Sequence, residues 1–123
     1  MDKVKYLDTY ALIEISKENA SFSEYLNNSI IISDLTLVEF YGVLLREEGD
    51  LVADYWFRKF EGYSVQVSKE ILIESVKFRH KNKTKNFSFF DAVGYIFALN
   101  NKIPFVTGDK EFKNMINVEF KRK

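Results

Sequence analysis

Short apolar runs and longer amphipathic stretches follow one another along the chain. Runs rich in Val, Ile, Tyr and Phe predict strands, because β-branched and aromatic side chains fit a pleated, buried surface. These runs fall at residues 4–7, 30–32, 63–67, 104–107 and 117–120. Apolar residues spaced three and four apart predict helices, at residues 9–17, 36–48, 51–60, 69–78, 92–101 and 111–115. The alternation predicts an α/β fold with three α/β/α layers: a central, mainly parallel sheet of about five strands with helices on both faces.

The composition is typical of one compact domain. The chain has 123 residues, 46% of them hydrophobic, including 12 Phe and 7 Tyr, which suits a single domain with a core. One Pro and five Gly leave no segment that resembles a linker, so residues 1–123 are expected to form one domain. No stretch is apolar enough for a membrane span, and the first five residues lack the apolar run of a signal peptide. We therefore expect a cytoplasmic protein.

Charge and reactive side chains narrow the possible chemistry. Eighteen basic and eighteen acidic residues cancel, so any nucleic-acid binding would depend on local charge or on metal ions. The absence of Cys excludes disulfides, thiolate catalysis and Cys-ligated zinc. The single histidine, His80, lies in a basic segment without an obvious acidic partner, which argues against a His-based catalytic triad.

Four acidic residues occupy positions of interest. In a parallel α/β sheet, ligands bind in the crevice outside the carboxyl ends of the strands. Asp8 ends the first predicted strand and Asp109 follows the fourth, although an acid after a strand is also an ordinary turn residue. Glu39 lies within an otherwise apolar helical segment and could point inward or toward solvent. Asp91 begins an apolar helix, where it could simply favour the helix dipole with Ser88 as the cap.

Convergence of these four side chains in one crevice would give them a common role. Two like charges about 4 Å apart repel by about 4 kcal/mol at an effective dielectric of about 20. Such a cluster needs bound cations to stay ionised, and carboxylate oxygens are ligands that Mg²⁺ and Mn²⁺ prefer. Ions held there could bind a phosphodiester, lower the pKa of a bound water and stabilise the leaving oxygen. The residues therefore favour metal-assisted hydrolysis.

The same segments resemble a known family. Asp8 in YLDTYALI, Glu39 in TLVEFYGVL, Asp91 in FSFFDAVGYIFALNN and Asp109 in VTGDKEF are similar, in order and spacing, to the acidic motifs of PIN domains. The resemblance runs nearly from end to end of the chain. It implies an endoribonuclease that depends on Mg²⁺ or Mn²⁺, with Asp8, Asp91 and Asp109 as metal ligands. By the same resemblance, Glu39 would help to hold a metal or orient the attacking water.

The resemblance also implies partners and supporting residues. Many small members of the family are the toxins of VapBC-type toxin–antitoxin pairs, which implies an RNA substrate, a homodimer and an antitoxin peptide that enters the acidic groove. Thr9 and Thr107 would support the acids by hydrogen bonds. Tyr10 departs from the small hydroxyl residue that is frequent at its position and could crowd the groove. Glu111, close to Asp109, could substitute for that acid or supplement it.

Two further segments each admit two interpretations. The basic run 79–86 could meet RNA phosphates beside the groove, or it could be a solvated helix end, where cations are also favoured. Trp56, Phe57 and Phe60 could stack on bases, but their helical spacing favours the core or a dimer interface. Residues 121–123 are expected to be frayed.

Two other functions remain open from the sequence. One is a PIN-like scaffold that binds RNA or protein without cleaving, although a scaffold has no need of four mutually repelling acids. The other is a metal-dependent phosphatase or phosphoacceptor protein with Asp8 as the nucleophile, which would leave Glu39 and Asp91 unexplained.

Overall fold

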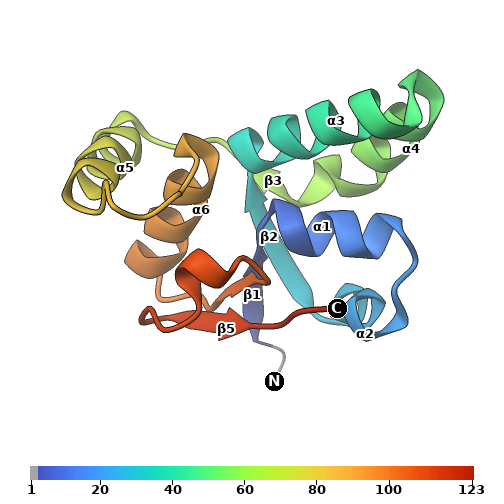
Figure 1. Ribbon diagram of the computed structural model, residues 1–123. Coiled ribbons are helices and arrows are strands. Elements are labelled where there is room, and N and C mark those ends of the chain that lie inside the picture. Colours follow the sequence, from blue (N-terminus) through green and yellow to red (C-terminus); the bar gives the residue numbers. More distant parts are fainter. Residues whose placement is uncertain (1–2) are drawn as a thin grey trace.

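A computed structural model describes residues 3–123 and contains a single parallel sheet (Figure 1). Met1 and Asp2, which belong to the expected domain of residues 1–123, lie outside the described residues. The strands are β1 (Val4–Leu7), β2 (Ser29–Ser33), β3 (Ser64–Val65), β4 (Phe105–Thr107) and β5 (Val118–Phe120). Their order in the sheet is β3-β2-β1-β4-β5, and every neighbouring pair is parallel. The predicted fold class is confirmed.

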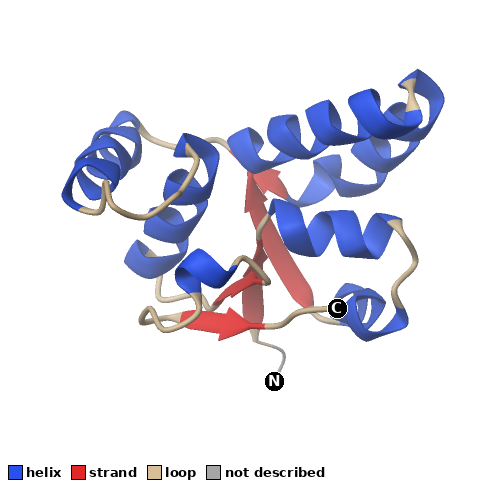
Figure 2. Cartoon of the chain, in the orientation of Figure 1, coloured by secondary structure: helices blue, strands red, loops and turns tan. Residues whose placement is uncertain are grey.

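Helices cover both faces of this sheet. The α-helices are α1 (Thr9–Ser16), α2 (Ala20–Ser23), α3 (Asp34–Glu48), α4 (Asp50–Phe60), α5 (Lys69–Lys81) and α6 (Phe89–Asn100). Short 3₁₀ turns are η1 (Glu24–Asn27), η2 (Glu61–Tyr63) and η3 (Lys110–Phe112). Figure 2 shows α1 to α4 on one side of the strands and α5, α6 and η3 on the other. The longest helix, α3, has 15 residues, and no helix in the described part of the chain is long and apolar enough to cross a membrane.

Alternating residues of the central strands enter two separate cores. Leu7 and Val106, paired across β1 and β4, belong to the core that contains side chains of α1, α3 and α4. The preceding pair, Tyr6 and Phe105, belongs to the core formed with α6 and η3. All four residues are fully buried. Because successive strand residues point to opposite faces, this division produces the three layers.

Three of the four aromatic residues of α4 belong to the first of these cores. Phe60 is 1% exposed and meets the ring of Phe40 edge-on, with 5.6 Å between the ring centroids. Trp56 and Phe57 are partly buried and pack against the same core. The core interpretation of these three residues is confirmed.

Three stretches differ from the predicted elements. Residues 20–27 form α2 and η1, although no helical spacing of apolar residues indicates them; Asn19 caps α2 through its side chain. The strand predicted at 63–67 is limited to β3, because its partner β2 ends at Ser33, where α3 begins. The helix predicted at 111–115 is reduced to the single turn η3.

A buried hydroxyl network fixes the start of α3 against β1. The Tyr6 hydroxyl donates to Ser33 Oγ at 2.9 Å and lies 2.8 Å from Thr36 Oγ1, while the Ser33 backbone N–H donates to the Tyr6 oxygen at 3.1 Å. Ser33 Oγ accepts from the Thr36 N–H at 3.1 Å and is the N-cap of α3. Since α3 carries Glu39, this network sets where Glu39 stands relative to the sheet.

Gly94→Ala should destabilise the protein, whereas Gly42→Ala should not. A Cβ at Gly94 in α6 would lie 2.9 Å from Tyr6 Cε1 and 3.1 Å from Phe105 Cε1. Within residues 3–123, a Cβ at Gly42 in α3 would have no atom within 4 Å apart from its chain neighbours and the nearby backbone of its own helix. Overpacking a core costs about 1–3 kcal/mol, while Gly→Ala inside an open helix gains about 0.5–1 kcal/mol. Urea unfolding should therefore shift the two midpoints in opposite directions. Equal shifts would contradict close packing of α6 on Tyr6.

Candidate active site

Asp8 lies at the carboxyl end of β1 and is almost completely buried, at 3% exposure. Its Oδ1 accepts a hydrogen bond of 2.9 Å from the Ala11 N–H, which makes Asp8 the N-cap of α1. The Asp8 backbone N–H donates to the Val106 carbonyl of β4 at 3.1 Å. A central strand and a helix start together hold this carboxylate at the edge of the sheet.

Asp109 follows β4 and caps η3. Its Oδ1 accepts from the Glu111 N–H at 3.0 Å, and its own N–H donates to Thr107 Oγ1 at 3.0 Å. Thr107 is fully buried. The Glu111 carboxylate accepts from the Asn86 N–H at 2.8 Å, so it is engaged by the loop before α6.

Asp91 and Glu39 meet at the start of α6. Ser88 and Asp91 form a capping box: the Ser88 N–H donates to Asp91 Oδ2 at 3.1 Å, and the Asp91 N–H donates to Ser88 Oγ at 3.0 Å. The Ser88 hydroxyl also donates to Glu39 Oε2 at 3.5 Å, and the Thr9 hydroxyl donates to Glu39 Oε1 at 2.5 Å. Of its two possible orientations, Glu39 therefore adopts the inward one, between α1 and α6.

Three of the four acids line one cavity. This acidic cavity has a volume of about 320 Å³ and is lined by Asp8, Tyr10, Asp91, Gly108, Asp109, Lys110 and Arg122. Glu39 is not part of the lining and connects to it through Ser88, which caps the helix of Asp91. The structure thus brings Asp8, Asp91 and Asp109 together and keeps Glu39 in an adjoining position.

Burial and mutual repulsion raise the pKa values of three of these acids. The pKa of Asp8 is raised to about 8, mainly by burial and also by the charges of Asp91 and Asp109, while hydrogen bonds to its oxygens act in the opposite direction. Burial also raises the pKa of Glu39, with a further contribution from Asp91. Burial likewise raises the pKa of Asp91, with a contribution from Asp109. A cation in the cavity would relieve this repulsion.

The donor set suits a hard divalent cation, although it is not assembled as a ready-made site. Carboxylate oxygens are the ligands that Mg²⁺ and Mn²⁺ prefer. Across residues 3–123, however, no three His, Asp or Glu side chains are arranged so that they could hold one ion as they stand. Mg²⁺ usually keeps several waters and binds through only one or two carboxylates, which the acids of this cavity can offer. The residues present therefore fit the predicted cofactor in their chemistry.

The sequence did not indicate two cationic side chains that line this cavity, Lys110 and Arg122. Arg122 reaches the cavity because the tail that was expected to be frayed is held in place. The Lys121 N–H donates to the Thr107 carbonyl at 2.8 Å, and Lys121 Nζ donates to the Ser21 carbonyl at 2.6 Å. The expectation of a frayed tail was wrong, because partners as far as 113 residues away in the sequence hold it. No local pattern in the sequence could reveal such contacts.

Tyr10, the departure from the family pattern, lines the acidic cavity. A Cβ at Gly108 would overlap the Tyr10 ring and lie 2.6 Å from the Lys121 carbonyl oxygen. The Tyr10 hydroxyl accepts from the Lys123 N–H at 3.3 Å. The missing side chain at residue 108 is therefore what allows the Tyr10 ring and the tail to lie together here.

Comparison with known proteins identifies the family. The profile described as PIN domain matches residues 5–117, which is almost the whole chain. This chain belongs to the PIN domain family. No curated protein sequence matches it significantly.

Several solved structures share the fold over nearly their whole length. VapC20 from Mycobacterium tuberculosis, described as a sarcin-ricin loop cleaving toxin, has a TM-score of 0.78 and 14% identity over 95% of this chain and 99% of its own. VapBC2 from Rickettsia felis, bound to a DNA fragment from its promoter, has a TM-score of 0.77 and 20% identity over 97% and 99%. DNA-bound VapBC from Salmonella typhimurium has a TM-score of 0.69 and 20% identity over 98% of both chains. At these identities the likeness shows a shared fold.

The metal-free protein should lose stability as the pH rises from about 4 to about 8. The pKa of Asp8 is about 8 in the folded chain, against about 3.9 for an unfolded Asp. Between these values the folded state keeps a proton that the unfolded state releases, so the free energy of unfolding falls by an amount on the order of a few kcal/mol. Urea unfolding in EDTA at about pH 5 and about pH 7.5 measures this difference.

Asp8→Asn is the matched variant for this measurement, because Asn keeps an oxygen that can cap α1. It should be more stable than the wild type at the higher pH and should show a shallower dependence on pH. The same slope in both proteins would contradict a strongly raised pKa at Asp8.

Proposed function

We propose that this protein is a metal-dependent endoribonuclease that hydrolyses RNA phosphodiester bonds at the acidic cavity. The observation that carries the proposal is the convergence of Asp8, Asp91 and Asp109 on one cavity of about 320 Å³. These acids come from the end of β1, the first turn of α6 and the turn after β4. A bound divalent cation would neutralise these buried acids and remove their mutual repulsion, and Mg²⁺ or Mn²⁺ is the expected cofactor.

Each acid has its own task under this proposal. Asp8, Asp91 and Asp109 would hold the cation through their carboxylate oxygens. When bound, the cation would supply Lewis acidity that lowers the pKa of a water and neutralises phosphate charge. Glu39 would help to hold the cation or orient the attacking water, since Thr9 and Ser88 donate to its two oxygens and fix its direction.

The two cationic side chains of the cavity would contact the RNA. Lys110 and Arg122 line the same space as the three aspartates. A guanidinium can donate two parallel hydrogen bonds to a phosphate, and an ammonium binds it as a point charge. The cavity would therefore bind the phosphate from its cationic wall and hold the metal on its acidic wall.

The proposal includes a role as the toxin of a toxin–antitoxin pair. Its support is the fold shared with VapC20, which is described as a toxin, and with two VapBC structures. An antitoxin and a second copy of the chain would be the protein partners. Large apolar side chains stand exposed on the α3–α4 pair, with Leu45 42%, Leu51 86% and Tyr55 46% exposed. A partner that covers them would remove this apolar surface from water.

A catalytically silent scaffold that binds RNA or protein is the second candidate. The observation that favours it is the lack, within residues 3–123, of three acidic or histidine side chains already arranged around one ion position. Against it, a silent scaffold gives no use to the buried Asp8 carboxylate.

Purified protein should cleave a mixed RNA pool in the presence of Mg²⁺ or Mn²⁺, and EDTA should abolish the cleavage. Asp8→Asn should lower the rate by about 100-fold or more, because it removes charge that stabilises the reacting centre through the metal. Asp50→Asn, which removes an exposed acid from the first turn of α4, is the matched control and should cleave like the wild type.

Metal binding gives a second readout for the same variants. Mn²⁺ should raise the unfolding temperature of the wild type and of Asp50→Asn, and raise that of Asp8→Asn much less. If the wild type is folded and its unfolding temperature rises with Mn²⁺, but the RNA stays intact, the nuclease proposal is wrong and the silent scaffold takes its place.

A further inference from the structure

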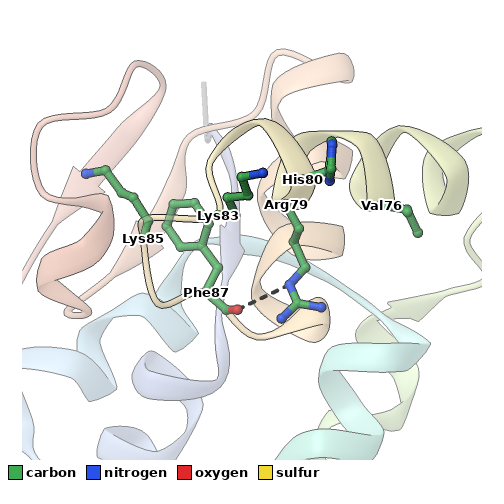
Figure 3. A pocket seen from close by; sticks show the side chains of 6 residues that line it. All are labelled: Val76, Arg79, His80, Lys83, Lys85 and Phe87. Atoms are coloured by element: carbon green, nitrogen blue, oxygen red, sulfur yellow. Dashed lines mark hydrogen bonds between the residues drawn. The ribbon is translucent and has the colours of Figure 1, made fainter.

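A second cavity, of about 320 Å³, gathers positive charge at the end of α5 and in the loop that follows (Figure 3). This basic pocket is lined by Val76, Arg79, His80, Lys83, Lys85 and Phe87. No carboxylate is among the lining residues, and within residues 3–123 none of its basic side chains forms an ion pair. A concave surface with uncompensated positive charge attracts anions.

Arg79 is held in place with part of its guanidinium free. Its Nε donates to the Phe87 carbonyl at 3.2 Å, as the dashed line in Figure 3 shows. Phe87 is 4% exposed, and its ring stacks on Phe78 with 5.3 Å between centroids. Across residues 3–123 the two terminal nitrogens of Arg79 have no hydrogen-bond partner. A pre-positioned guanidinium with free N–H groups is suited to phosphate oxygens.

The loop of the basic pocket is fastened to the acidic cavity. The Asn86 N–H donates to Glu111 Oε1 at 2.8 Å, and Lys85 Nζ donates to the Glu111 carbonyl at 3.1 Å. The Glu111 N–H in turn donates to Asp109 Oδ1 at 3.0 Å. The helix that follows the loop carries Asp91 in its first turn. The basic pocket therefore lies next to the acidic cavity.

We propose that the basic pocket binds a backbone phosphate of the RNA strand beside the phosphate that is cleaved; this inference rests on the proposed nuclease function. A nucleic-acid strand carries a phosphate at every nucleotide, so a strand with one phosphate in the acidic cavity brings another to the neighbouring surface. The protein has no net charge to attract RNA from a distance, so affinity depends on local clusters of this kind. An acidic peptide would have no such reason to lie here, because it brings no scissile phosphate to the acidic cavity.

Binding of a fluorescein-labelled single-stranded RNA, measured by anisotropy in EDTA at several salt concentrations, tests the pocket without cleavage. Arg79→Gln/Lys83→Ala should bind about 10-fold more weakly than the wild type. The slope of log affinity against log salt should become shallower by about 0.7, because the pocket neutralises one phosphate and each lost phosphate contact contributes about 0.7 for a single strand. Lys83→Glu, which leaves the bond from Arg79 to Phe87 intact, should weaken binding as well and guards against a folding defect.

Lys69→Ala/Lys77→Ala is the matched control, since it removes two charges from a different surface of α5 that also carries Glu70 and Glu74. It should keep the wild-type slope. The proposal would be overturned if Arg79→Gln/Lys83→Ala and the control variant lose RNA affinity equally, or if Arg79→Gln/Lys83→Ala keeps the wild-type affinity. Two further results would also overturn the proposal. If inorganic phosphate binds the pocket while Arg79→Gln/Lys83→Ala keeps the wild-type affinity for RNA, the pocket is a site for a free anion. If polyglutamate competes with the labelled RNA as strongly as unlabelled RNA does, the pocket is a site for an acidic protein.

Cleavage assays with Mg²⁺ separate this inference from the nuclease proposal. If the wild type cleaves RNA and the double variant Arg79→Gln/Lys83→Ala binds and cleaves RNA normally, the proposal for the basic pocket is overturned and the nuclease proposal stands. If the wild type does not cleave RNA and the double variant loses affinity for RNA, the nuclease proposal is overturned and the pocket remains an RNA-phosphate site.

Discussion

The burial of the Asp8 carboxylate is the constraint on which the carboxyl edge of this sheet depends. β1 lies between β2 and β4, and α1 begins at the next residue, so the side chain of residue 8 is enclosed. An ionised carboxylate removed from water is costly unless hydrogen bonds or a cation compensate. The Ala11 N–H supplies part of this compensation, while two neighbouring aspartates oppose it. Without a cation, Asp8 therefore keeps its proton up to a pH of about 8, and a bound divalent cation would favour its ionised form.

The three aspartates of the cavity share a second property, because the side chain of each takes part in capping a helix or a 3₁₀ turn. Asp8 caps α1, Asp109 caps η3, and Asp91 forms the capping box of α6. Capping is a local relation between neighbouring residues, so the sequence pattern could locate these acids at strand ends and helix starts. The parallel order of the strands then brings their ends to one edge. For this reason the fold class and the positions of these residues could be predicted, although their role as metal ligands stays a prediction.

Features set by distant contacts could not be predicted in the same way. The direction of Glu39 depends on Thr9, 30 residues earlier, and on Ser88, 49 residues later. The choice of Asn86 as the partner of Glu111 likewise joins segments that the sequence keeps apart. The length of β3 depends on where its neighbour β2 gives way to α3 at Ser33. Each of these features follows from the packing of elements against one another, which periodicity along the chain does not encode.

The held tail has a practical consequence for work on this protein. The Lys123 N–H is bonded to the Tyr10 hydroxyl, and Arg122 lines the acidic cavity. Any polypeptide joined after Lys123, including a purification tag, would therefore begin at the rim of that cavity. A polyhistidine tag at this end would bring extra metal-binding imidazoles to the place where metal content is to be measured. Preparations with a free carboxyl terminus at Lys123 avoid this interference.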